Sequence, residues 1–132
     1  MVWDLHIVVT LNKNWWSDDS SEEVEIEHDE TAEFDIDISF ECDEPSVRKI
    51  LAQVFTDFAK TSVGAGTYSI DINDEETTCF DSLNENHFSL LNSSCEINVL
   101  YETEEHVYND EESIKRYKNN LVKCFQSYCL LK

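Results

Sequence analysis

A strict two-residue alternation over residues 33–42 is the feature that most constrains the fold of this chain. Apolar residues occupy the even positions, and acidic residues or serine occupy the odd positions. Residues 23–28 alternate in the same way. The inward members of the two segments are Val24, Ile26, His28, Phe34, Ile36, Ile38, Phe40 and Cys42. A period of two with one apolar side is typical of a strand with one face on the core and one in water. We therefore predict an antiparallel ribbon of two strands, closed by a turn at 29–32.

The rest of the chain contains further segments of regular period. Residues 2–11 alternate with both sides partly apolar, which favours a central strand. Two segments repeat apolar residues every three or four positions, as amphipathic helices do, and Asn109 with Glu112 has capping-box spacing before the second. These helices are expected at 45–62 and about 110–130, and further strands at 67–73, 77–81 and 95–102. We predict a single α+β domain over 1–132, in the order βββ-α-βββ-α, with a mostly antiparallel sheet packed against two helices.

The acidic residues are concentrated in two segments. The chain has 29 Asp and Glu against nine Lys and Arg, a formal net charge of −20. Residues 18–44 hold 14 of the acids and residues 71–112 hold another 13, and neither segment contains Lys or Arg. Five of the nine bases lie at 115–132. The second acidic segment could lie on the same surface as the first or on another.

The predicted ribbon carries a row of carboxylates on its solvent face. Its members are Glu23, Glu25, Glu27, Glu33, Asp35, Asp37 and Glu41. Like charges across a strand pair destabilise it, and Asp and Glu are poor strand formers. A requirement other than stability is therefore indicated. The alternatives are an ordinary solvated sheet face and the acid surplus of a halophilic or structural protein without a partner.

Carboxylates at every second residue of two paired strands recur about once per ~3.4 Å, about half the linear charge density of duplex DNA. In size, charge and layout the chain resembles, as a class, the DNA-mimic inhibitors of phage and mobile elements, such as some anti-CRISPR and anti-restriction proteins. It also resembles the small acidic immunity proteins that neutralise nuclease toxins. Either resemblance implies a non-catalytic inhibitor that blocks the nucleic-acid-binding or active-site groove of a basic protein.

The loop expected at 12–22 adds candidate contact residues to the ribbon. Trp15 and Trp16 lie beside Asp18 and Asp19. An exposed Trp inside a charged rim is a common interface anchor. The alternative is that one or both tryptophans cover the core from the loop. We include all four residues in the predicted partner-binding site.

The sequence contains no motif that strongly indicates a metal site or a catalytic site. Asp71 to Glu76 begins like a calcium-binding loop, but glutamate replaces the expected glycine at its sixth position. The Cys79, His87 and Cys95 spacing matches no common zinc site. Common nucleophile, metalloprotease and nucleotide-binding motifs are absent. We expect no metal, no cofactor and no enzyme activity, with a Cys-centred enzyme as the remaining alternative.

Charge and cysteine content also limit the partners. A polyanion is repelled by nucleic acid and by anionic membranes, so the expected partner is a basic protein, such as a nuclease or another nucleic-acid-binding protein. No apolar run reaches the ~18 residues of a membrane span. The five cysteines form no CxxC, which favours reduced, mostly buried thiols. We expect a cytoplasmic protein of a bacterial or phage-infected cell.

Overall fold

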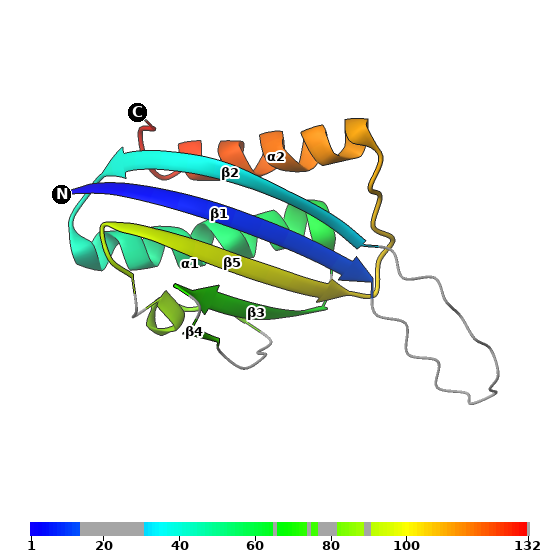
Figure 1. Ribbon diagram of the computed structural model, residues 1–132, viewed down its shortest axis with the longest axis horizontal. Coiled ribbons are helices and arrows are strands. Elements are labelled where there is room, and N and C mark those ends of the chain that lie inside the picture. The colour runs from blue at the N-terminus through cyan, green and yellow to red at the C-terminus, as the bar shows by residue number, and fades with distance from the viewer. Residues whose placement is uncertain (14–30, 65, 74, 77–81, 89–90, 132) are drawn as a thin grey trace.

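The computed structural model describes residues 1–13, 31–64, 66–73, 75–76, 82–88 and 91–131. One mixed sheet forms a layer, and both α-helices pack against one of its faces (Figure 1). The strands lie in the order β2-β1-β5-β3-β4. Their bounds are β1 Val2–Lys13, β2 Thr31–Glu41, β3 Gly66–Ile72, β4 Glu75–Glu76 and β5 Ser94–Thr103. The helices are α1 Glu44–Phe58 and α2 Glu111–Gln126, with a π-helical turn η1 at Ala59–Val63 and a short 3-10 helix η2 at Glu85–Phe88.

The predicted fold class is confirmed: an α+β arrangement of a single sheet on two helices. Three strand pairings are antiparallel, and β1 pairs with β5 in parallel. The central position expected for the first strand is also found, because β1 lies between β2 and β5. The strands expected at 23–28 and 77–81 lie outside the described residues. Among those described, none of the helices is long and apolar enough to cross a membrane.

The connection predicted at 29–32 is wrong in its second half. Thr31 and Ala32 already belong to β2, opposite Asn12 and Leu11 of β1. The described partner of β2 is therefore β1, in a register that sets Ile36 opposite Ile7. Alternation identifies the strand but not its neighbour, because any strand with a matching apolar side satisfies it.

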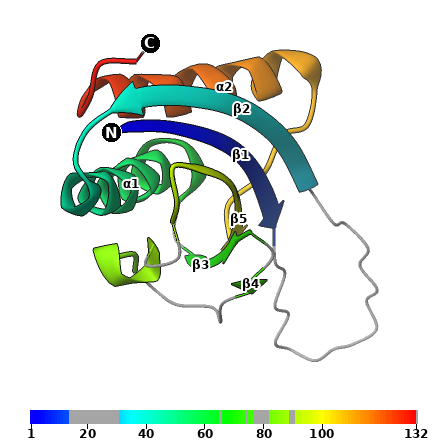
Figure 2. The same cartoon turned by 60° about the vertical axis from the view of Figure 1, so that its left-hand side comes forward.

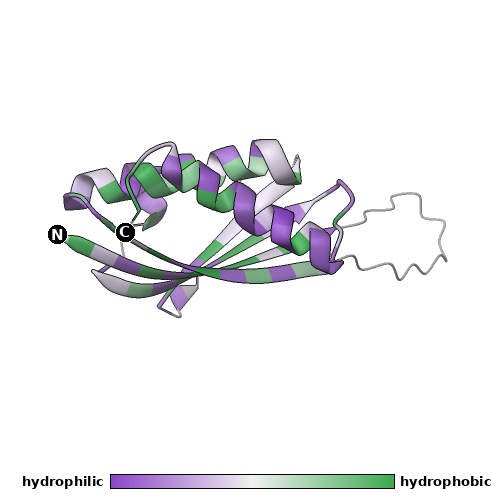
Figure 3. Ribbon diagram, turned by 90° about the horizontal axis from the view of Figure 1, so that it is seen from above, coloured by the Kyte–Doolittle hydropathy of each residue, from purple (hydrophilic) through white to green (hydrophobic). Residues whose placement is uncertain are grey.

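The core lies between the sheet and the two helices. Side chains at odd positions of β1 are buried there, as are most of the apolar side chains of α1 and α2. Figure 3 shows both helices on one side of the sheet, with hydrophobic and hydrophilic residues alternating along each ribbon. Phe58 lies at its centre, completely buried, with ring centroids 6.1 Å from Phe34 and 5.7 Å from Tyr101. The hydroxyl of Tyr101 donates a hydrogen bond of 2.9 Å to the backbone carbonyl of Phe55. These contacts hold the sheet to α1. Both α-helices of the described residues lie on this side of the sheet, so neither covers its other face (Figure 2).

Both α-helices begin at an aspartate cap. The side chain of Asp43 accepts a hydrogen bond from the backbone N–H of Ser46, and Asp110 accepts one from that of Ser113. Hydrogen bonds from the side chains of Ser46 and Ser113, followed by these backbone bonds, lower the pKa of the two carboxyl groups, because they favour the charged form. The cap expected at Asn109 is therefore one residue early. Asp110 can satisfy the free N–H groups of the first turn equally well.

Gly66 permits the close approach of β3 to β5. A Cβ atom built on this residue would lie 1.9 Å from the backbone oxygen of Glu102. We expect Gly66→Ala to destabilise the protein by about 1–3 kcal/mol, because the backbone of one strand must shift to relieve the overlap. Urea unfolding measures this difference. An unchanged midpoint would show that the two strands can separate without loss of stability.

Candidate partner-binding face

Among the residues that the structure describes, the sheet face opposite the helices carries eight carboxylates from four strands, and we call it the acidic face. In β2, side chains at odd positions are directed there, and in β1 those at even positions. The register of β5 and β3 extends the same face across the sheet. Its carboxylates are Asp4 of β1, Glu33, Asp35, Asp37 and Glu41 of β2, Asp71 of β3, and Glu96 and Glu102 of β5.

Both acidic segments of the sequence contribute to this face. Glu96 lies across β1 from Asp37, since both residues pair with His6. Glu102 pairs with Asn12 in the parallel ladder, and Asp71 pairs with Asn98 of β5. The parallel pairing of β1 with β5 therefore brings the second acidic segment beside the first.

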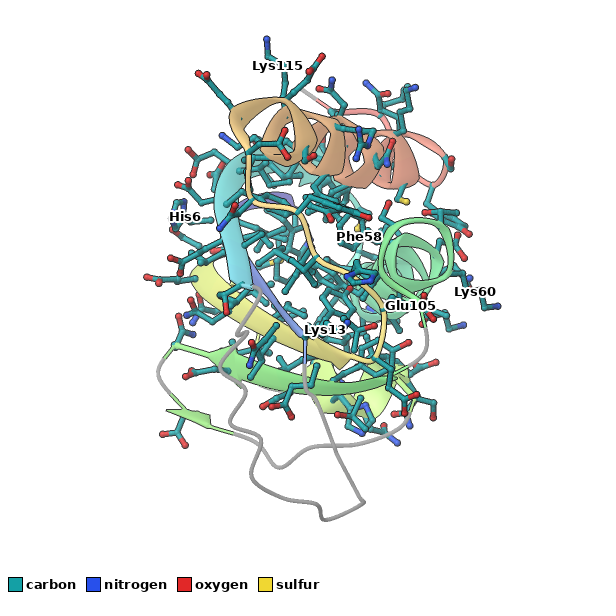
Figure 4. The ribbon with its side chains drawn as sticks, turned by 90° about the vertical axis from the view of Figure 1, so that its right-hand side faces the viewer. His6, Lys13, Phe58, Lys60, Glu105 and Lys115 are labelled. Carbon is teal, nitrogen blue, oxygen red and sulfur yellow. The ribbon has the colours of Figure 1, made fainter. Side chains whose placement is uncertain are left out.

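Lysine and arginine lie elsewhere in the described structure. The described strands contain one base, Lys13, whose position in β1 places its buried side chain on the helix side of the sheet. Seven of the nine Lys and Arg belong to α1, η1 and α2. Figure 4 shows Lys60 and Lys115 on the helical side and His6 on the opposite side of the sheet. The two layers thus differ in their charge composition.

The charge density of the acidic face can be estimated from strand geometry. The carboxylates extend from Glu102, which the register sets level with Thr31, to Glu41 at the other end of β2. Ten residues of strand correspond to ~34 Å, so the eight carboxylates amount to one per ~4 Å, about two-fifths of the density of duplex DNA, which has one charge per ~1.7 Å. Their backbone is fixed in paired strands, so binding of a partner costs side-chain conformational entropy but little backbone entropy.

His6 lies among these carboxylates. Its Nδ1 is 2.7 Å from Oδ1 of Asp37, and its Nε2 is 3.6 Å from Oδ2 of Asp35. The hydrogen bond to Asp37 is the main cause that raises the pKa of His6, and the charges of Asp37, Asp35 and Glu96 add to it against a smaller opposing effect of burial. Protonation of His6 therefore stabilises the fold below its ordinary pKa, a contribution lost as the pH rises through the raised pKa.

A hollow of about 540 Å³ opens beside His6 on the acidic face. Its wall includes the carboxylates of Asp4, Asp37 and Glu96. The hydroxyl of Ser39 donates a 2.8 Å hydrogen bond to Asp4, which orients that carboxylate. The hollow is thus lined by oxygen acceptors, the groups that a guanidinium or ammonium donates to.

The structure places four of the predicted site residues together. Glu33, Asp35, Asp37 and Glu41 are all exposed on the acidic face. Other predicted members lie outside the described residues: Trp15, Trp16, Asp18, Asp19, Glu23, Glu25 and Glu27. Asp4, His6, Asp71, Glu96 and Glu102 are additions that the alternation did not single out. The available signal was the odd or even position of each residue within its strand, which decides the side of the strand to which it points. That position identifies a common face of the sheet only when the neighbouring strands are known.

Comparison of the chain with protein-family models, curated proteins and solved structures found no match. The functional argument therefore depends on the geometry and charge of the acidic face.

The described cysteines have little of the character of catalytic thiols. Burial is the main cause that raises the pKa of Cys42, Cys95, Cys124 and Cys129. A raised pKa lowers the fraction of thiolate, which is the nucleophilic form. In the part of the chain that the structure describes, no three His, Cys, Asp or Glu residues are placed to hold a metal ion.

Proposed function

We propose that this chain is a non-catalytic inhibitor whose acidic face binds the nucleic-acid-binding groove of a basic protein. The observation that carries the proposal is the convergence of eight carboxylates on one sheet face, without Lys or Arg from the described strands. Such a face presents to a basic groove the charge that a nucleic-acid backbone presents. By its resemblance to DNA-mimic inhibitors, we extend the proposal to a nuclease of a host defence system as the target.

Electrostatic steering supports this function. An extended face of one sign attracts an oppositely charged groove over several ångströms and raises the rate of association. The attraction weakens with salt, because the Debye length falls from ~10 Å at 0.1 M to ~3 Å at 1 M. Fast, salt-sensitive association suits an inhibitor that must reach its target before nucleic acid does.

The segregation of charge favours a binding face over a general solubility role. The helical layer mixes both signs, as in the ion pair of 3.2 Å between Arg48 and Glu44. A halophilic surface gains acid over the whole molecule, whereas the described strands have acid on one face and apolar residues on the other. The halophilic alternative also requires that the fold be lost at low salt, which circular dichroism can test directly.

A pull-down with DNA competition tests the proposed function. The immobilised protein is incubated at low salt with bacterial lysate, and bound proteins are eluted first with a duplex DNA oligonucleotide and then with salt. We expect nucleic-acid-binding proteins to be enriched and to be released by the DNA, because they bind DNA and the acidic face through one groove. Mass spectrometry identifies the eluted proteins, and a Glu33→Lys, Asp35→Lys, Asp37→Lys bait is the control.

The result that would count against the proposal is equally specific. If DNA releases none of the captured proteins, the acidic face does not occupy a nucleic-acid groove. If the control bait captures the same proteins in the same amounts, the face is not the interface. Either outcome would leave the description of the fold and of the acidic face unchanged, but it would overturn the proposed inhibitor function.

A further inference from the structure

A titratable histidine, His6, lies at the centre of the acidic face and carries a positive charge when it is protonated. The charged or titratable groups that face His6 are Asp35 and Asp37 from β2, Glu96 from β5 and Asp4 from its own strand. The thiol-bearing residue Cys95 also contributes to the adjoining hollow. The side chain of His6 is 40% exposed, so a partner can reach it. Protonated His6 is the positive charge that the described strands place on this face.

The state of His6 changes what an incoming cation meets. When the imidazole is protonated, it donates to Asp37 across 2.7 Å and repels a guanidinium that approaches the same carboxylate. When it is neutral, the repulsion is gone and the full charge of Asp37 is available. A cationic side chain that enters the hollow therefore competes with the His6 proton for the same carboxylates.

We propose that binding of a basic partner to the acidic face is coupled to release of a proton from His6. This inference rests on the proposed function and adds a regulation to it: the affinity for the partner is set by pH. The partner must supply Arg or Lys to the hollow beside Asp4, Asp37 and Glu96. The free protein holds the proton through Asp37 and its neighbours, and the bound partner replaces that positive charge.

The direction of the pH dependence follows from linkage. His6 has a raised pKa in the free protein because of Asp37 and the nearby carboxylates. A bound cation opposes these effects and lowers the pKa in the complex. Between the two pKa values the free protein holds more protons than the complex, so affinity rises with pH. When one proton is released on binding, the affinity can rise by at most about tenfold per pH unit.

An arginine peptide makes this measurable. Arginine stays protonated at all relevant pH values, so acetylated, fluorescein-labelled nona-arginine contributes no arginine titration of its own. Fluorescence anisotropy at constant low ionic strength between pH 6 and 8.5 should show wild-type affinity rising about 3- to 10-fold. His6→Gln should bind the peptide tightly and His6→Arg should bind it weakly. In both variants the affinity should not change with pH. Gln removes the charge and Arg makes it permanent.

His106→Gln is the matched control. His106 is exposed beyond the end of β5 and makes a ring contact with Tyr108, so it lies away from the hollow. This variant should retain the wild-type pH dependence. Calorimetry near pH 7 in two buffers of different ionisation enthalpy should detect proton release by the wild type and by His106→Gln, and none by His6→Gln.

The two proposals fail in different ways in this experiment. If the peptide binds but His6→Gln keeps the wild-type slope, or the wild-type affinity falls as pH rises, proton coupling at His6 is wrong and the acidic face remains a binding face. If no variant binds the peptide at low salt, the cation-binding role of the face is wrong and the coupling falls with it. Circular dichroism of each variant confirms that the folds are comparable.

Discussion

The Glu33→Lys, Asp35→Lys, Asp37→Lys variant is expected to bind nona-arginine about 100-fold more weakly than the wild type at low salt. Each reversal at an exposed position removes one attraction and adds one repulsion of ~0.5 kcal/mol each, or ~1 kcal/mol together. Three reversals therefore amount to ~3 kcal/mol, which corresponds to a factor of about 100 in the dissociation constant. The difference between wild type and variant should shrink as salt is added, because screening removes both contributions.

A second triple variant separates the acidic face from net charge. Glu85→Lys, Glu104→Lys and Glu105→Lys also change the formal charge from −20 to −14, at exposed positions outside the described strands. We expect this variant to lose only a few-fold in affinity. Equal losses in the two variants would mean that total charge, and not its arrangement on β2, determines binding.

The acidic-face reversals should not unfold the protein. Glu33, Asp35 and Asp37 point away from the core, and the side chain of Asp37 is 85% exposed. Removing carboxylates from this face relieves repulsion between neighbouring strands, which offsets the lost hydrogen bond from His6. We expect urea midpoints equal to or slightly above that of the wild type, so that any loss of binding reflects the interface.

Phe58→Ala is expected to lower the free energy of unfolding by about 3–5 kcal/mol. Phe58 is completely buried between the sheet and the helices (Figure 4). Its ring contacts those of Phe34, Tyr101 and Tyr117. Truncation removes buried apolar surface and leaves a cavity that three rigid rings cannot fill. Since small domains are stable by ~5–15 kcal/mol, the loss is a large share of the total.

Two controls place this loss in the core. Phe58→Leu keeps most of the buried volume and should cost about 1–2 kcal/mol. Tyr108→Ala removes an aromatic ring that is 53% exposed and should change stability by less than ~1 kcal/mol. Urea unfolding with linear extrapolation provides all three values. A cost for Phe58→Ala no greater than that for Tyr108→Ala would show that the two layers are not held together at this position.

Local patterns predicted most of the regular elements. The helix expected at 45–62 appears as α1 at Glu44–Phe58 followed by the π-helical turn at Ala59–Val63. The strand expected at 95–102 is β5 at Ser94–Thr103, one residue longer at each end. Such agreement is physical: side-chain direction repeats every two residues in a strand and every 3.6 in a helix, whatever the neighbours are.

Neighbours were harder to predict. The alternation of 33–42 with that of 23–28 predicts a hairpin, but 23–28 lies outside the described residues, and the partner that the structure shows for β2 is β1. The parallel pairing of β1 with β5 was not predicted at all, since an apolar period is the same in a strand of either direction. For His6 the position in the alternation was not enough to indicate a site residue, because its proximity to Asp37 and Glu96 arises only from these two pairings.

The sequence by itself determined that the strand at 33–42 has a Phe/Ile side and an acidic side, because alternation acts within one strand. It also determined that the segments 18–44 and 71–112 hold most of the acids and contain no Lys or Arg. Only the tertiary structure decided that Glu96, Glu102 and Asp71 share a face with β2 and that His6 lies among its carboxylates. Strand order and direction are set by how apolar sides from distant segments pack against the helices, a balance that no local pattern contains.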